Sequence, residues 1–226
     1  MLYRLACGLL FASLPLLMLV WPSQAYASIV EIDSYWMQQP SDWSPSIQSR
    51  QQSQPQIVSQ TGISLKGGHH WHVIDLSFDE TTRQVIDFRN SSVIANFEHW
   101  VFDRNSGELI NRLVGGIESE QDNPYFLRHG RDQVFEPGQY QIVTRMDSPF
   151  YLAQPQPTVF AQGEYQQSIK VGNALTLICQ GIFLALGIYY FVLGTSRSRA
   201  ADLLYALFIT GNFFFTGASL LVFSDL

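Results

Sequence analysis

Two long apolar segments constrain the fold of this chain more than any other feature. Residues 171–194 and 203–223 contain no charged side chain, and each exceeds the roughly 20 residues that an α-helix needs to cross a bilayer core. Residues 195–202 form a short link between them. A buried helical pair in a soluble protein is the alternative, but such helices usually carry a polar stripe. We therefore predict two transmembrane helices joined as a hairpin.

The N-terminus carries the pattern of a secretory signal peptide. Arg4 precedes an apolar run over residues 5–21, and the small residues Ala25 and Ala27 follow it. Removal of residues 1–27 would leave Cys179 as the only cysteine. No internal disulfide could then form, and the exported part must be stabilised by its core.

Charge around the apolar segments predicts their orientation. Arg197 and Arg199 lie in the link at residues 195–202, and positively charged loops stay in the cytoplasm. The signal peptide independently predicts that residues 28–170 are exported. Both features predict a bacterial inner-membrane protein with its N-terminal domain in the periplasm and a cytoplasmic link.

Three polar side chains interrupt the apolar segments. Asn173 and Gln180 are seven residues apart and share one face of the first helix, and Asn212 is the matching polar residue of the second. Such groups are costly against lipid and usually face other helices. We expect them to couple the helices to partners, although isolated polar residues can also be tolerated.

The exported segment has the composition and pattern of a β domain. Of 19 acidic and 13 basic residues in the chain, two acidic and three basic ones lie outside residues 28–170, which leaves 17 against 10 and a net charge of −7. This balance disfavours nucleic-acid binding. Residues 28–56 are interpreted as a first strand followed by a polar arm rich in Gln, Ser and Pro. Residues 57–168 alternate short apolar runs with turns, which predicts an antiparallel β-sandwich.

Histidine and tryptophan supply the candidate ligand-binding residues. His70 and His72 lie two apart in a predicted strand and would share a face, a spacing that can hold Zn²⁺ or Cu²⁺, and His99 could join them from a neighbouring strand. The alternative is that these histidines form a polar start of a strand and that their rings are solvated, since no third or fourth metal ligand is identified. Trp43, in the polar arm, is the tryptophan expected to be exposed and able to stack on a sugar ring. The sequence predicts no catalytic residue, metal or cofactor.

Residues 62–226 resemble a known family. Gly67-Gly68-His69-His70-Trp71 opens one strand, Ile94 to Asp103 forms another that ends in an aromatic residue and a turn, and Pro137-Gly138 precedes the last long strand. The membrane segments continue the likeness in the run Gly181 to Tyr190 and in Asp202 to Leu207. In order and spacing the chain resembles bacterial seven-transmembrane receptors with diverse intracellular signalling modules, of the class with a type 2 extracellular domain.

The resemblance implies a jelly-roll sensor, similar to carbohydrate-binding modules, joined to a seven-helix bundle and a cytoplasmic output such as a diguanylate cyclase or histidine kinase. It also implies a small molecule or saccharide as periplasmic ligand and a homodimer as the full-length receptor. Since the chain stops after two predicted helices, we expect it to be a truncated form with no enzymatic activity of its own. A membrane-tethered, metal-dependent enzyme using His70 and His72 is the second hypothesis. A non-signalling envelope-binding module is the third.

Overall fold

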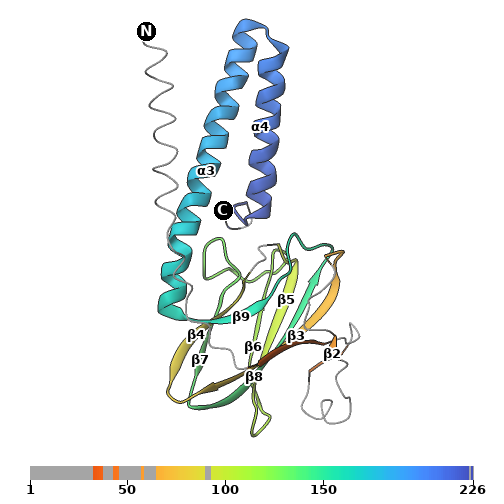
Figure 1. The fold of residues 1–226 in the computed structure, drawn as a ribbon, viewed down its shortest axis with the longest axis vertical. Helices are drawn as coiled ribbons and strands as arrows, with labels where there is room; N and C mark the ends of the chain where they lie inside the picture. The colour runs from red at the N-terminus through yellow and green to blue at the C-terminus, as the bar shows by residue number, and fades with distance from the viewer. Residues whose placement is uncertain are drawn as a thin grey trace.

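A computed structural model describes residues 33–37, 43–45, 57–58, 65–89, 93–223 and 225. The predicted signal peptide and most of the polar arm lie outside the described residues. A β domain occupies one end of the molecule, and two antiparallel helices rise from it side by side (Figure 1). The predicted combination of antiparallel β structure with two long apolar helices is confirmed.

The β domain consists of two antiparallel sheets. The larger sheet has the strand order β2-β1-β3-β8-β5-β6, and the smaller has the order β7-β4-β9. The strands are β1 (Asp33–Met37), β2 (Ile57–Val58), β3 (Gly68–Phe78), β4 (Thr82–Phe88), β5 (Asn96–Asp103), β6 (Leu109–Gly115), β7 (Arg131–Phe135), β8 (Gly138–Ser148) and β9 (Pro157–Ala161).

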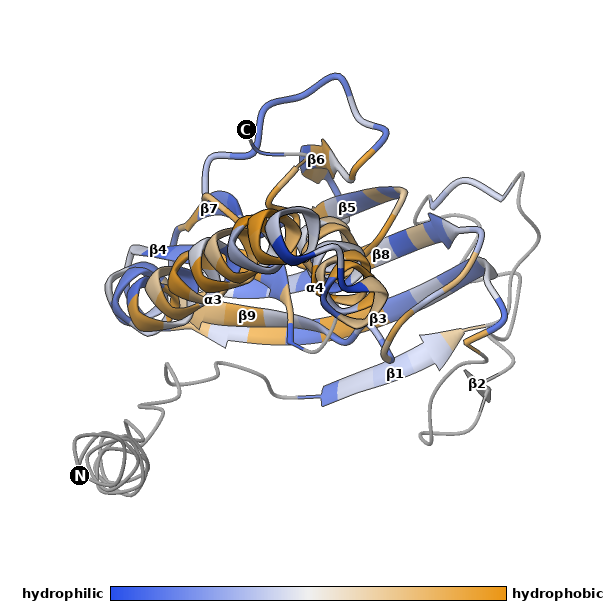
Figure 2. Ribbon diagram, turned by 90° about the horizontal axis from the view of Figure 1, so that it is seen from above, coloured by the Kyte–Doolittle hydropathy of each residue, from blue (hydrophilic) through white to orange (hydrophobic). Residues whose placement is uncertain are grey.

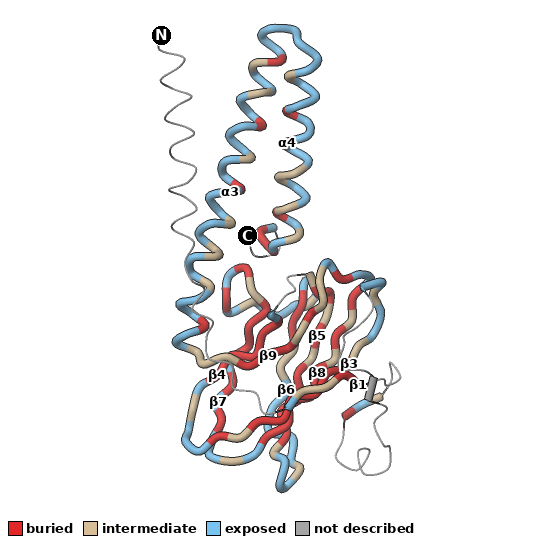
Figure 3. Tube along the Cα trace, in the orientation of Figure 1, coloured by how far each residue is buried: buried red, intermediate tan, exposed pale blue. Residues whose placement is uncertain are grey.

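Side-chain alternation along the strands places the core between the two sheets. On β3, Ile74 and Leu76 point inward and meet Ile86 of β4 and Val159 of β9. All four are at most 1% exposed. Because successive strand residues face opposite sides, Trp71 and Val73 lie on the outer face of the larger sheet, as the alternating pattern predicts. The buried strands form the red layers of Figure 3.

The turn after β5 follows from local side-chain chemistry. The Asp103 carboxylate accepts hydrogen bonds from the backbone N–H groups of Asn105 (2.8 Å) and Ser106 (2.7 Å). Gly107 adopts a φ of 75°, which glycine tolerates without strain. The predicted turn after Asp103 therefore joins β5 and β6 as a hairpin, and Asp103 fixes its geometry.

The boundaries differ from the sequence prediction at three places. β1 belongs to the larger sheet and pairs with β3, so the first predicted strand is part of the sandwich and not of an arm. Strands β7 and β9 were not predicted. The sandwich ends at Ala161, before the predicted boundary at residue 168, because residues 162–168 are helical.

The first helix is longer than its predicted segment, and the second is shifted along the chain. Helix α3 (Gln162–Arg197) begins earlier than residue 171 and ends later than residue 194, and α4 (Ala200–Ser219) is displaced toward the link. Both are long and apolar enough to cross a membrane, and only 17% of each span is buried. At 1.5 Å per residue the 36 residues of α3 extend roughly 54 Å. That length exceeds a bilayer core of about 30 Å. The N-terminal part of α3 accordingly runs alongside the β domain (Figures 1 and 3).

Candidate functional site: the junction between the β domain and the helices

The loop between β6 and β7 connects the β domain to both helices. We call residues 116–130 the bridging loop. Its carbonyl at Phe126 accepts a hydrogen bond of 2.7 Å from the Asn173 side chain of α3. Its Leu127 packs with Leu221 and Val222, which directly follow α4. One loop of the β domain thus contacts α3 and the end of α4.

Arg131, the first residue of β7, holds the base of the bridging loop. Its guanidinium donates to the carbonyls of Val114 (2.9 Å) and Gly130 (3.0 Å) and to the Asn123 side chain (3.1 Å). The same group lies 5.4 Å from the centre of the Phe97 ring. Arg131 is only 6% exposed. Because burying an unpaired charge is costly, these contacts restrict where the loop can go.

A buried hydrogen bond connects the first turns of α3 to the smaller sheet. The Tyr165 hydroxyl donates to the Asp87 carboxylate of β4 at 2.5 Å, and both side chains are almost fully buried. Val85 and Tyr125 complete the apolar contact around Tyr165. Burial raises the pKa of Asp87, while the Tyr165 hydroxyl, His129 and Arg128 act in the opposite direction.

A second polar contact lies at the surface beside Tyr165. The Tyr125 hydroxyl donates to Asp132 at 2.7 Å, and the Gln162 side chain donates to the same carboxylate oxygen at 3.0 Å. Helix α3 follows β9 without an intervening loop, since β9 ends at Ala161 and α3 begins at Gln162. Residues 162–170 are therefore the first turns of α3 and not a separate connection. A displacement of the smaller sheet would therefore be transmitted directly to α3.

The end of α4 is tied to the bridging loop by Asp225. Its carboxylate accepts hydrogen bonds from the backbone N–H of Leu127 (2.5 Å) and from the Asn123 side chain (2.9 Å). Asn123 in turn accepts a hydrogen bond from Arg131. A continuous polar path therefore runs from β7 through the bridging loop to the segment after α4.

Within the hairpin, small and polar residues of α3 face α4. Gln180, Gly187 and Gly194 are the buried members of α3 beyond Tyr165, and they repeat every seven residues. The Gln180 side chain hydrogen-bonds to Thr216 at 2.8 Å. A Cβ added at Gly194 would come within 2.8 Å of the Leu203 side chain. These three residues define the helix seam.

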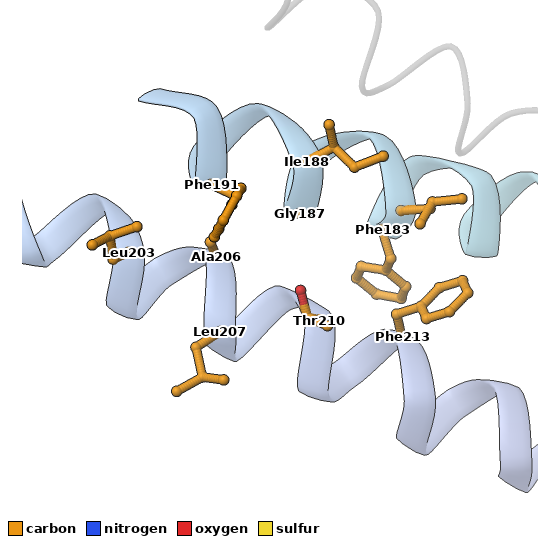
Figure 4. Close-up of a pocket in the computed structure, with 10 residues that line it drawn as sticks. Phe183, Gly187, Ile188, Phe191, Leu203, Ala206, Leu207, Thr210 and Phe213 are labelled. Carbon is orange, nitrogen blue, oxygen red and sulfur yellow. The ribbon is translucent and has the colours of Figure 1, made fainter. Parts of the chain in front are cut away.

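An apolar groove lies along the helix seam. It encloses about 480 Å³ around Gly187, with Phe183, Leu203 and Phe213 among its lining residues. Figure 4 shows Gly187 opposite Ala206 and Thr210, with the phenylalanine rings beside this close approach.

The polar residues predicted in the helices have three different environments. Gln180 faces the neighbouring helix, whereas Asn173 faces the bridging loop. The Asn212 amide donates to the carbonyl of Phe208 in its own helix at 2.8 Å, and its contact with a partner stays a prediction. Gly181 does not line the helix seam, since a Cβ there would meet nothing within 4 Å. Asn173 and Gln180 thus share one face of α3 but contact different parts of the molecule, the bridging loop and α4.

Arg197 and Arg199 lie at the turn between the helices. α3 ends at Arg197 and α4 begins at Ala200, so the link consists of Ser198 and Arg199 and is shorter than the predicted link at residues 195–202. Ser198 takes a left-handed conformation with a φ of 52°, which reverses the chain. Both arginines are at the end of the hairpin opposite the β domain (Figure 1).

The three candidate histidines share the predicted face, but that face is the interior. His72 is 2% exposed and His99 is fully buried, and they flank Thr144 on three adjacent strands. The Nδ1 atom of His99 hydrogen-bonds to the Thr144 hydroxyl at 2.8 Å. Burial lowers the pKa of His72 to about 4. Burial, together with the nearby charges of Arg131, His129 and His72, lowers the pKa of His99 to about 3.

These positions argue against ligand binding at His72 and His99. His70, at the strand start, is only partly buried, and burial lowers its pKa. Among the described residues no three His, Cys, Asp or Glu side chains are grouped so that they could hold a metal ion. The two buried rings are instead part of the packing: His72 lies edge-on to Trp36 at 4.7 Å, and His99 lies 4.9 Å from Phe97.

Trp43 belongs to an aromatic cluster on the outer face of the larger sheet. It is half-buried and meets Trp71 edge-on at 4.7 Å, and Trp71 stacks on Trp100 at 5.7 Å. Trp43 is thus more exposed than the buried Trp71 and Trp100, but its ring packs against Trp71 instead of standing free. The Arg112 guanidinium lies 5.7 Å from the Trp100 ring.

Charged side chains border this cluster. Arg112 donates to the Glu98 carboxylate at 2.8 Å, and Arg145 approaches the other oxygen of the same carboxylate at 3.4 Å. Farther along the face, Asp75 accepts a hydrogen bond of 2.6 Å from Gln141. We refer to Trp43, Trp100, Arg112, Glu98 and Arg145 as the outer-face cluster.

The sequence indicated Asn173 but not the other polar residues that form the junction. Asp87, Tyr165, Arg131 and Asp225 are single polar residues within apolar or mixed segments. The one signal is Asp87 itself, a carboxylate between Ile86 and Phe88 in a predicted strand. No protein-family model matches the chain, and no curated protein matches it either.

Proposed function

We propose that this chain is a ligand-sensing module whose β domain controls the position of two membrane helices. The observation that carries the proposal is the junction. α3 continues directly from β9 and is fixed by the Asp87–Tyr165 hydrogen bond, while the bridging loop holds both α3 and the segment after α4. A ligand that prefers one arrangement of the β domain would bias the helices through these contacts.

The outer-face cluster is the proposed ligand site. It combines partly exposed aromatic surface with charged groups that can donate and accept hydrogen bonds, which suits a saccharide or another polar small molecule. The side chain of Arg112 is 56% exposed and that of Arg145 is 30% exposed, so both can reach a ligand. The interior histidines have no part in this proposal.

The resemblance supplies the cellular setting of the proposal. Signal peptide, basic link and apolar helices support a bacterial inner-membrane location with the β domain, of jelly-roll type, in the periplasm. In its full-length form the receptor would be a homodimer that controls a cytoplasmic output such as a diguanylate cyclase or histidine kinase. These features are part of the proposal and rest on sequence pattern.

The test uses the chain in lipid nanodiscs and a panel of neutral and acidic oligosaccharides. We expect at least one oligosaccharide to change tryptophan emission from the outer-face cluster. The same oligosaccharide should change the distance between spin labels at Asn105 of the β domain and Leu207 of α4. The exposed variant Arg112→Ala should weaken that response, whereas Arg83→Ala, on the smaller sheet, should not.

The outcomes separate the proposal from its alternatives. Binding without a change of distance would support a non-signalling envelope-binding module. No response of emission or distance to any oligosaccharide would count against a saccharide sensor.

A further inference from the structure

The two ends of the β domain differ in surface chemistry. The helix end contains the bridging loop and the loops at residues 65–67 and 149–156, because β3 begins at Gly68 and β8 ends opposite it at Ser148. The turn end contains the turns at residues 79–81, 104–108 and 136–137. Both ends expose acidic side chains, Asp79, Glu80, Glu108 and Glu136 at the turn end and Glu118, Glu120 and Asp122 at the helix end, so the difference lies in the exposed apolar side chains.

Exposed apolar side chains gather at the helix end. Eight large hydrophobic side chains of the described β domain are exposed. Three of them lie on the edge strands β6 and β7. The other five lie in helix-end loops: Leu65 (48%), Ile117 (39%), Phe126 (38%), Phe150 (50%) and Leu152 (45%).

Two of these loops are held together in a fixed conformation. The Tyr151 N–H donates to the Leu65 carbonyl at 3.2 Å, and the Tyr151 hydroxyl donates to the Gly68 carbonyl at 2.9 Å. The Ser148 hydroxyl donates to the Phe150 carbonyl at 2.7 Å. At Gly67 a Cβ would lie 2.2 Å from the Pro149 carbonyl oxygen, so only glycine permits this approach. Leu65, Phe150 and Leu152 are therefore directed outward by an ordered support.

The helices set the level of the membrane surface relative to these loops. α4 has 20 residues, or roughly 30 Å of helix, which matches one bilayer core. Its end lies directly above the larger sheet in both views (Figures 1 and 2). Phe126 also belongs to this level, because its carbonyl contacts Asn173 where α3 leaves the β domain. The exposed apolar side chains thus lie where the bilayer interface begins.

We infer that the helix end of the β domain contacts the lipid bilayer, with Leu65, Phe126, Phe150 and Leu152 inserted into the interfacial region. In water the apolar area of these side chains would stay in contact with solvent, which is unfavourable. At the interface the apolar area of each side chain would be removed from water, which is favourable. These side chains lie at the end of the β domain from which the two apolar helices rise (Figure 1), which favours lipid over a soluble partner. This contact would fix the tilt of the β domain on the membrane.

The inference depends on insertion of α3 and α4, which belongs to the proposed function, and the test separates the two. The full chain, with Cys7→Ala and Cys179→Ala as background, is reconstituted in phosphatidylcholine nanodiscs. An environment-sensitive fluorophore is attached at Phe150→Cys, at Asn105→Cys on the turn end, or at Leu207→Cys on the exposed face of α4. Quenching by nitroxide-labelled lipid and by aqueous iodide is then measured at each position.

We expect the label at position 150 to be quenched severalfold more by nitroxide lipid than the label at 105, and less by iodide. The label at 207 should be quenched most strongly by lipid. If position 207 is quenched and 150 is as accessible to iodide as 105, the lipid contact is overturned and insertion stands. If 150 is protected from both quenchers, protein covers the surface, which also overturns the inference. If 207 is not quenched, the membrane hairpin itself fails.

Discussion

At the scale of single residues, His72 and His99 show how a polar ring can belong to a core. Both lie between the sheets beside Thr144, and burial keeps both imidazoles neutral in the folded protein. A free histidine has a pKa of about 6.5. The unfolded chain therefore binds protons more readily than the folded chain as pH falls. The stabilising contribution is fully present above pH 6.5 and is lost as pH falls toward 4.

This linkage predicts an acid-sensitive β domain. For His72 alone, the free energy of unfolding should fall by about 2 kcal/mol between pH 7 and pH 5. His72→Leu should remove that part of the pH dependence, whereas His69→Leu, at an exposed position of the same strand, should leave it unchanged. Urea unfolding of the chain in detergent micelles, followed by tryptophan emission at several pH values, measures how steeply the free energy of unfolding of each variant changes with pH. If the free energy of unfolding depends on pH equally in His72→Leu and in the wild type, the His72 ring does not contribute to the acid sensitivity.

The hydrogen bond between Tyr165 and Asp87 should be the most costly single contact to remove at the junction. Tyr165→Phe leaves a buried carboxylate without its hydroxyl donor, and such a loss typically costs about 1–3 kcal/mol. Tyr125→Phe is the matched control, because Asp132 still accepts a hydrogen bond from Gln162. Urea unfolding compares the two variants. A larger loss for Tyr125→Phe would contradict the assignment of Tyr165 as the main anchor.

Sequence pattern identified the face of a strand but not what covers it. The two-residue spacing correctly placed His70 and His72 on one face of β3, which Ile74 and Leu76 continue. It could not show that the smaller sheet lies over His72, because that contact brings together strands far apart in the chain. The burial of His72 and the half-buried state of Trp43 both depend on such long-range packing.

At the scale of elements, the helix seam determines how α3 and α4 approach. Gly187 and Gly194 allow close contact with Thr210 and Leu203, and Gln180 adds a hydrogen bond to Thr216. Small residues permit such contact within a membrane, where hydrophobic burial does not drive association. The seam therefore depends on shape and on one polar pair.

A larger side chain at the seam should separate the helices. Gly194→Leu would place a Cβ within 2.9 Å of the Leu203 backbone nitrogen, and backbone cannot easily yield. Gly181→Leu, directed into open space, should have no such effect. Double electron–electron resonance measures the distance between spin labels at Tyr189 of α3 and Leu204 of α4, both exposed, in nanodiscs. We expect a longer or broader distance for Gly194→Leu alone. The same distance in both variants would refute the seam.

Hydropathy located the helices but not their ends. Residues 162–170 carry Glu164, several glutamines and Lys170, so no apolar run marks them as helix. They are helical because Tyr165 packs against the smaller sheet while the polar side chains face water. Strands β7 and β9 were missed for a related reason. Each has only five residues, and both are stabilised by pairing with β4.

At the scale of the whole molecule, the bridging loop makes the β domain and the helices one mechanical unit. Arg131 and Asn123 connect β7 to Asp225, and Asp225 caps the Leu127 amide. The contacts of Asp225 could not be read from the sequence, because they join residues about a hundred positions apart. These contacts join β7 to the segment after α4, whereas α3 is also joined to the β domain directly through β9.

Removal of the Asp225 carboxylate should release α4 from the β domain without unfolding either part. Asp225→Ala takes away the acceptor of the Leu127 amide and of the Asn123 side chain, so we expect faster hydrogen exchange across residues 123–130. Exchange in β3 and β8 should not change, because the core between the sheets does not include Asp225. Asp122→Ala, an exposed acid of the same loop, is the control for altered charge. Faster hydrogen exchange throughout the β domain would mean that Asp225 supports the fold and not only the connection to α4. Unchanged exchange at Leu127 would mean that α4 is held by its apolar contacts with Leu127 alone.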